Sequence, residues 1–290
     1  METITELDRL RVHVGEWRRA GLRVGFVPTM GNLHAGHHSL VRLAREHADR
    51  VVASVFVNPT QFGPHEDFNR YPRTPDLDAV GLAAAGCDVM WLPKVETMYP
   101  HGADASVQVR VPGVTEVLEG EFRPGHFDGV ATVVTRLLNQ VQPDVAVFGR
   151  KDYQQLAVIR YLVHDLAFPV QVVAAETLRE PDGLAMSSRN QYLSADERPQ
   201  AAEILRVLQA MRDAYLAGVD RVEVESVALA RLRAAGFEPD YAALRRPDLS
   251  IQDEADRGPR VALIAARLGR TRLIDNLEIS VPESTLKQAI

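Results

Sequence analysis

The chain has 290 residues, of which 46% are hydrophobic and 25% charged, as in a globular enzyme of one large or two smaller domains. Its net charge of −6 argues against a nucleic-acid-binding protein, because such proteins usually present a basic face. No apolar run is long enough to span a bilayer, the first residues lack the pattern of a secretory signal, and a single cysteine cannot form an internal disulfide. We therefore expect a cytoplasmic enzyme without membrane or nucleic-acid partners.

Strand and helix patterns alternate through the first part of the chain. Short apolar runs predict buried strands at residues 22–27, 51–57, 88–92, 145–148 and 170–173. Helical patterns follow these strands, at residues 38–45, 75–86, 127–141 and 152–166. Alternation of this kind indicates an α/β fold with a doubly wound, Rossmann-like parallel sheet.

The pattern changes in the last third of the chain. Two long helices are expected there, at residues 194–217 and 222–235, and two shorter strands, at residues 260–265 and 272–277. This combination indicates a smaller C-terminal α+β domain. We place the boundary near Glu176, so that the predicted domains are residues 1–175 and 176–290.

The stretch of residues 28–37 follows the first predicted strand and leads into a helix. Gly31 lets the chain bend, and Gly36 lets a ligand approach the first helical turn, where N–H groups and the positive dipole end favour a phosphate. His34 and His37 are three residues apart, so on a helical turn they share a face and can both donate to phosphoryl oxygens. The stretch therefore predicts a phosphate site.

Two other interpretations of this histidine pair remain open. A zinc site would need a third ligand at suitable spacing, and neither the only cysteine, Cys87, nor another residue provides one. The pair could also be ordinary surface histidines at a helix start, because a four-residue pattern recurs by chance. We assign no metal ligand.

Polar residues also follow the second predicted strand, where ligands gather in doubly wound sheets. The amide side chains of Asn58 and Gln61 could bind hydroxyls or a carboxylate without adding charge, which makes both candidates for substrate binding. Asn58 as a turn residue and Gln61 as a solvent-facing residue is the plainer alternative. The polar segment 63–70 is predicted to be an exposed loop that could close over a site.

A third candidate segment, residues 148–155, ends one predicted strand and starts a helix. Lys151 would lie at the helix N-terminus as a point charge beside a phosphate, Asp152 suits the first turn, and Gln155 could face the same crevice one turn later. The fourth segment, residues 184–190, offers two serines and Arg189, whose guanidinium can bind phosphate in a bidentate manner. A charged surface helix and a plain linker are the alternatives.

The chain carries neither a P-loop nor a G-x-G-x-x-G pattern, so a P-loop NTPase and an ordinary NAD dehydrogenase are not supported. Instead, its motifs resemble those of the pantothenate synthetase (pantoate–β-alanine ligase) family, in the nucleotidylyltransferase superfamily with the H-x-G-H signature. The segments that carry the resemblance are residues 28–37, 56–62, 70–74, 123–127, 148–155 and 186–190.

This resemblance implies that ATP and pantoate form pantoyl adenylate and pyrophosphate, and that β-alanine then displaces AMP to give pantothenate. It also implies Mg²⁺ with the ATP and a homodimer. No residue of these motifs is an obvious covalent nucleophile, so we expect a non-covalent adenylate. Closure of the 63–70 loop and the second domain would protect that anhydride from water. The alternatives are another small-molecule adenylyltransferase and a non-catalytic nucleotide-binding protein.

Individual roles are implied as well. His37 would be the proton-donating histidine, with His34 and Lys151 as further catalytic groups, while Gln61 and Gln155 would hold pantoate and Gln61 would also lie near the β-alanine site. The residues implied to bind ATP are Met30, Gly31, Asn32, Leu33, His34, Ala35, Gly36, His37, Gly149, Arg150, Lys151, Asp152, Leu178, Met186, Ser187, Ser188 and Arg189. At Arg150 the sequence departs from the family, which commonly has Glu or Gln before the lysine.

Overall fold

The structure is a computed structural model that describes residues 1–63, 68–251 and 258–281. The chain forms two compact units, each with its own sheet and core. Unit 1 comprises Met1–Arg150 and Gln154–Leu178, and unit 2 comprises Lys151–Tyr153 and Arg179–Ile290. The functional domains predicted from the sequence, residues 1–175 and 176–290, remain a prediction.

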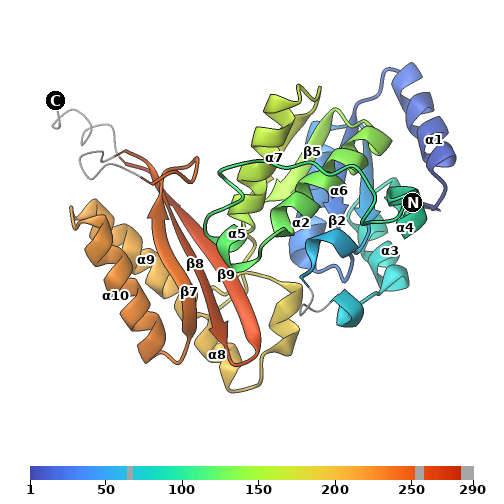
Figure 1. Cartoon of the computed structure of the whole chain (residues 1–290). Helices are drawn as coiled ribbons and strands as arrows, with labels where there is room; N and C mark the ends of the chain where they lie inside the picture. Colours follow the sequence, from blue (N-terminus) through green and yellow to red (C-terminus); the bar gives the residue numbers. More distant parts are fainter. Residues whose placement is uncertain (64–67, 252–257, 282–290) are drawn as a thin grey trace. The chain divides into compact units, whose positions relative to one another are not determined.

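In its described residues, unit 1 has a six-stranded parallel sheet (Figure 1). Its strands are β1 (Glu2–Ile4), β2 (Val24–Thr29), β3 (Arg50–Val55), β4 (Val89–Trp91), β5 (Val145–Gly149) and β6 (Gln171–Ala175). Their order across the sheet is β1-β4-β3-β2-β5-β6. The chain leaves β2 toward one edge through β3 and β4, and returns to the other side of β2 with β5. This order confirms the doubly wound α/β fold, and its switch point lies between β2 and β5.

The helices of the first part of the chain alternate with these strands as the sequence predicts. They are α1 (Leu7–Arg19), α2 (Ala35–His47), α3 (Pro75–Ala84), α4 (Val95–Met98), α5 (Glu119–Phe122), α6 (His126–Val141) and α7 (Tyr153–Asp165), with short 3-10 turns η1 (Pro59–Gln61) and η2 (Phe68–Arg70). Within the loop expected at residues 63–70, residues 64–67 lie outside the described part of the structure.

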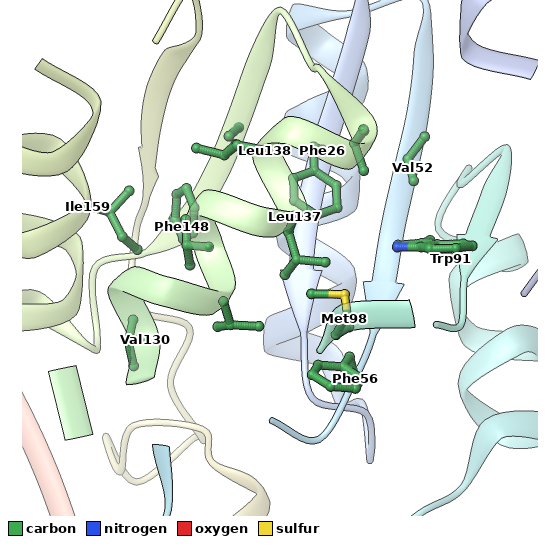
Figure 2. Packing of buried hydrophobic residues seen from close by; sticks show 14 of the residues in the cluster. Phe26, Val52, Phe56, Trp91, Met98, Val130, Leu137, Leu138, Phe148 and Ile159 are labelled. Carbon is green, nitrogen blue, oxygen red and sulfur yellow. The ribbon is translucent and has the colours of Figure 1, made fainter. Parts of the chain in front are cut away.

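Both faces of the parallel sheet are buried, which explains why its strands are almost continuously apolar. Alternate residues of one strand point to opposite faces, so Phe26 joins one apolar cluster with α1, α6 and α7, whereas Val27 joins another with α2 and α3. Figure 2 shows the first cluster, in which Leu137 and Leu138 of α6 lie beside Phe26. Full burial of one such side chain stabilises the fold by about 1.5–3 kcal/mol.

Unit 2 contains an antiparallel sheet in the order β7-β8-β9, formed by β7 (Glu238–Arg245), β8 (Arg260–Leu268) and β9 (Thr271–Ile279). Its helical segments are η3 (Ser188–Tyr192), α8 (Glu197–Ala201), α9 (Glu203–Leu216) and α10 (Arg221–Ala234). Buried residues of α9 and α10, such as Leu208 and Leu232, share one core with the sheet. The smaller α+β region is thus confirmed, but the helix predicted at 194–217 is interrupted at Ala202.

None of the helices in residues 1–63, 68–251 and 258–281 combines the length and the apolar composition that a membrane crossing requires.

The only cysteine of the chain, Cys87, generates a prediction about reactivity. Burial raises the pKa of its thiol from the ordinary value of 9.0 to about 12. Because the thiolate is the nucleophile, native Cys87 should not react with a thiol reagent at about pH 8, whereas the denatured chain should titrate one thiol. Since only the unfolded thiol ionises between these two pKa values, stability should fall as the pH rises through that range. Equally fast labelling of the native and the denatured chain would contradict this.

Candidate functional site

The loop between β2 and α2 is held by a carboxylate of α3. Asp78, only 2% exposed, accepts hydrogen bonds from the backbone N–H groups of Asn32 (3.0 Å) and Leu33 (2.8 Å). Gly31 has a φ of +87°, and a Cβ there would lie 3.0 Å from an oxygen of Asp78. Glycine suits this position because it adopts a positive φ readily and has no Cβ to crowd Asp78. The path of the loop therefore depends on a residue that sequence analysis did not single out.

The histidine pair caps the N-terminus of α2 reciprocally. Nδ1 of His34 accepts from the N–H of Gly36 (3.1 Å), and Nδ1 of His37 accepts from the N–H of His34 (3.3 Å). A ring nitrogen that accepts carries no proton, so the neutral form of each ring has its proton on Nε2. The ring centroids are 4.2 Å apart. The two histidines thus place two Nε2–H donors together at the helix start.

One expectation is modified by this geometry. The N–H groups of the first helical turn were expected to favour a phosphate, but one of them, that of Gly36, donates to His34. Donors at this helix end are consequently supplied by imidazole rings, which reach farther from the helix axis than the amide does.

A third histidine of α2 has a different environment. Nε2 of His38 lies so close to α3 that a Cβ at Gly81 would be 2.3 Å from it. Burial, and then the charge of Arg42, lower the pKa of His38, whereas Asp78 acts in the opposite direction. At neutral pH His38 is therefore an uncharged packing residue between α2 and α3.

Gln61 lies beside the loop after β2 and is 8% exposed. Its Oε1 accepts from Nδ2 of Asn58 (3.1 Å), and its Nε2 donates to the sulfur of Met30 (3.0 Å). Two predicted site residues from different strand ends, Met30 and Gln61, are thus in direct contact. A thioether is a weak acceptor, so a ligand oxygen would be a better partner for this amide.

Asn58 is buried, with 1% of its surface exposed. Its Nδ2 also donates to the carbonyl of Gly129 (3.1 Å), and its Oδ1 accepts from the hydroxyl of Tyr99 (2.6 Å). Burial raises the pKa of Tyr99, which keeps that hydroxyl protonated as a donor. Because the amide of Asn58 is used on both sides inside the protein, Asn58 positions Gln61, and its own contact with a substrate remains a prediction.

The backbone of Gln61 is held by a histidine. Nδ1 of His126 lies 2.8 Å from the carbonyl of Gln61, and Nε2 of His126 lies 3.0 Å from a guanidinium nitrogen of Arg123. A guanidinium can only donate, so Nε2 accepts and the proton on Nδ1 is donated to Gln61. The segment 123–127 carried part of the family resemblance, and this contact gives two of its residues a position in the site.

Strand β5 runs parallel to β2 and pairs with it near the start of both strands, at Gly25 with Val145 and Phe26 with Ala146, so both strands end at the same edge of the sheet. After Gly149, the N–H of Arg150 donates to the carbonyl of Ala175 (2.8 Å), and its guanidinium forms an ion pair with Glu176 (2.9 Å). Both the backbone and the side chain of Arg150 are therefore bound to residues at the end of β6.

Two adjacent glutamines of α7 differ in their environment. Gln154 is 3% exposed and bonds the N–H of Glu119 (3.0 Å) and the carbonyls of Val114 (2.8 Å) and Val117 (2.7 Å). Gln155 is half-buried, and its side chain makes no hydrogen bond with any described residue. Of the two, Gln155 has the amide that can bind a ligand, and its role in holding pantoate stays a prediction.

The remaining predicted residues lie mainly in unit 2. Nζ of Lys151 is 3.9 Å from the carboxylate of Asp152, and the hydroxyl of Ser187 accepts from the N–H of Arg189 (3.3 Å). Leu178, the last residue of unit 1, is 40% exposed. Within the described residues, no group of three or more His, Cys, Asp or Glu side chains could hold a metal ion.

Comparison with known proteins identifies the family. The family model for pantoate-beta-alanine ligase matches residues 2–278. The chain belongs to this family. A pantothenate synthetase of Xanthomonas campestris is 65% identical over 282 residues, covering 96% of this chain and 99% of that protein, and one of Xylella fastidiosa is 66% identical over 279 residues with the same coverage. The chain is thus a ligase that forms an amide bond, as the resemblance implied.

Solved structures of this family share the fold. A pantothenate synthetase of Thermus thermophilus superposes with a TM-score of 0.88 at 47% identity, covering 97% of this chain and all of that one. The pantoate-beta-alanine ligase of Francisella tularensis, described as complexed with beta-gamma ATP and beta-alanine, gives a TM-score of 0.81 at 30% identity over 96% and 97% of the two chains.

The role of Asp78 in holding the loop between β2 and α2 can be tested with Asp78→Ala. This change leaves the N–H groups of Asn32 and Leu33 without their acceptor, which should cost about 1–3 kcal/mol per unpaired group and lower pantothenate formation at least about tenfold. Asp76→Ala removes an exposed carboxylate from the same helix turn and is the matched control. Urea unfolding and steady-state rates would measure both effects. Equal activity of the two variants would refute the claim that Asp78 holds this loop in place.

The close contact between α6 and η1 supports a second test. A Cβ at Gly129 would lie 2.3 Å from the carbonyl oxygen of Thr60 and 2.7 Å from the nitrogen of Gln61. Gly129→Ala should therefore destabilise the fold by about 1–3 kcal/mol and displace Gln61, lowering activity. Gly15→Ala in α1 meets no atom within 4 Å and should be neutral or stabilising by up to about 1 kcal/mol. Thermal melts and rate assays compare the pair, and unchanged activity of Gly129→Ala would contradict the displacement of Gln61.

Proposed function

We propose that this ligase condenses pantoate with β-alanine to pantothenate, using ATP, through a non-covalent pantoyl adenylate, with release of AMP and pyrophosphate. The observation that carries the proposal is the reciprocal cap of His34 and His37, which places two ring donors at the start of α2, in the loop that follows β2. ATP and β-alanine as substrates are supported by the complex described for the Francisella relative.

Pantoate would be held by two amides. Gln61 has its oxygen bound to Asn58 and its nitrogen on the weakly accepting sulfur of Met30, so a carboxylate or hydroxyl of pantoate can replace the sulfur as acceptor. Gln155 would supply a second amide without introducing charge. Gln61, which Asn58 and His126 hold in place, would also lie near β-alanine, as the family resemblance implies.

The chemistry explains why phosphate-directed donors are needed. A carboxylate is a poor acyl donor until one of its oxygens belongs to a phosphate leaving group, and attack on the α-phosphorus builds up charge that fixed donors stabilise. Nε2–H of His37 would donate to the phosphoryl oxygens as the main catalytic group, with His34 beside it. Lys151 would act as a point charge and Arg189 as a bidentate fork.

The proposed ATP contacts come from residues 30–37, 149–152 and 186–189 and from Leu178. Within this set, Arg150 would hold the end of β5, because its N–H and its guanidinium are bound at the end of β6. Mg²⁺ would arrive with the triphosphate. The described residues fit an ion bound mainly by phosphate oxygens and water, since they offer single carboxylates such as Asp152 and no ligand cluster.

A non-covalent adenylate is supported by the state of the two candidate nucleophiles, of which Cys87 lies before β4, at the opposite end of the strands from the site. Cys87 is buried as a thiol with a raised pKa, and the hydroxyl oxygen of Ser187 already caps the N–H of Arg189. The homodimer is a part of the proposal that rests on the family resemblance, and the cytoplasmic location is the expectation drawn from the sequence.

Exchange of labelled pyrophosphate into ATP tests the reaction order. With pantoate present and β-alanine absent, exchange should occur, because the first half-reaction can run backward by itself; with β-alanine alone, none should occur. Adding both substrates should yield pantothenate and AMP, and no label should stay on denatured protein. Exchange that requires β-alanine would indicate a concerted route, and a stable protein adduct would reveal a nucleophile. Absence of AMP with all three substrates would refute the proposed function.

A further inference from the structure

Strand β9 of unit 2 carries two adjacent buried polar residues outside every motif discussed so far. Asp275 and Asn276 are each 5% exposed. Burial of a charged and a polar group is unfavourable unless both are hydrogen-bonded, so their partners indicate what they do. Those partners are Lys151 and Arg179, which lie far from β9 in the sequence and belong to, or lead into, segments of the proposed ATP site.

Asn276 holds the backbone of Lys151. Its Nδ2 donates to the carbonyl of Lys151 at 2.8 Å, across 125 residues of sequence. Because a peptide group is planar, fixing this carbonyl also fixes the plane that it shares with the N–H of Asp152, which points the opposite way. The side chain of Lys151, 18% exposed, thus starts from an anchored backbone.

Asp275 holds Arg179 with both carboxylate oxygens. Two guanidinium nitrogens of Arg179 lie 2.6 and 3.1 Å from them, and one donates in addition to the carbonyl of Gly183 (3.1 Å). The backbone of Arg179 pairs with Ala185 in an antiparallel bridge. Ala185 directly precedes residues 186–189, so this ion pair anchors the start of that loop to β9.

The bridge between Arg179 and Ala185 closes residues 179–185 into a hairpin, and this hairpin has a second ion pair at its tip, between Asp182 and Arg198. There the side chains are 38% and 33% exposed, whereas Asp275 is 4% and Arg179 22% exposed. Solvent weakens exposed pairs, and loss of one partner from a buried pair leaves an uncompensated charge. The anchor of the hairpin is therefore its base on Asp275 rather than its tip.

We propose that Asp275 and Asn276 are a positioning pair for the ligase reaction. Asn276 sets the backbone of Lys151, and Asp275, through Arg179, sets the start of the 186–189 loop. Neither residue contacts a substrate. This inference rests on the proposed function, because it assigns the pair to residues that act on ATP there.

The first test replaces the donor of Asn276. Asn276→Asp keeps the shape and removes the N–H, and Asn276→Ala removes it without adding charge. Each should lower kcat about 10–100-fold, the scale on which a misplaced catalytic group costs rate, with the KM for pantoate unchanged. Tyr215→Phe is the matched control, because it removes another 2.8 Å side-chain bond to a carbonyl within unit 2, that of Gly258.

A merely structural role would lower the melting temperature of the Asn276 variants and of Tyr215→Phe alike, while kcat per folded enzyme stayed at the wild-type value. Asp275→Asn should raise the KM for ATP about tenfold or more by freeing the loop. Arg179→Lys keeps the positive charge but loses the bidentate contact of the guanidinium. Its KM for ATP should therefore lie between those of Asp275→Asn and the wild type. If Asp275→Asn does not fold, the Asn276 variants decide.

A double-mutant cycle identifies the route of the effect. If Asn276 acts through Lys151, Asn276→Ala should lower kcat much less in a Lys151→Ala background than in the wild type. Full additivity, or kcat in both Asn276 variants equal to that of Tyr215→Phe, would overturn the positioning proposal. Failure of the wild-type enzyme to form pantothenate would instead overturn the proposed function, so the two outcomes are distinguishable.

Discussion

The hydrogen bonds from the loop after β2 to Asp78 are the constraint on which the rest of the candidate site depends. They hold the chain while it leaves the central strand and enters α2, and so they determine where the cap of His34 and His37 begins. A bare helix N-terminus would offer amide donors close to its own axis. Capping by two histidines replaces one of those amides with ring donors farther out.

Much of the fold could be predicted because a parallel sheet with both faces covered leaves a plain mark in the sequence. Strands β2, β3 and β5 are nearly continuous apolar runs for that reason. Strand β1 has only three residues, too few for a pattern, and β7 includes Pro239 and an irregular register, so neither was predicted. The break between α8 and α9 at Ala202 was missed because a helical pattern continues through it.

The candidate site was predictable only where its chemistry is local. The histidines and Gln61 lie in short motifs at strand ends, whereas Asp78, His126 and Asn276 act on residues 45, 65 and 125 positions away. The residues next to Asp78, His126 and Asn276 in the sequence do not indicate which distant residues these three contact. The two glutamines of α7 show the same limit, because only the three backbone bonds of Gln154 distinguish it from Gln155.

The short segment after β5 shows how long-range contacts can serve Lys151, for which a catalytic role is proposed. The N–H of Arg150 is bound to Ala175 at the end of β6, and the carbonyl of the next residue, Lys151, is bound to Asn276 of β9. Two consecutive residues are therefore held by two different sheets. A lysine loses up to about 2 kcal/mol of side-chain entropy when it is ordered, and a mobile backbone would add to that cost. Anchoring the backbone during folding removes this additional entropy cost, so that only the side chain of Lys151 would have to be ordered in the proposed binding of the triphosphate.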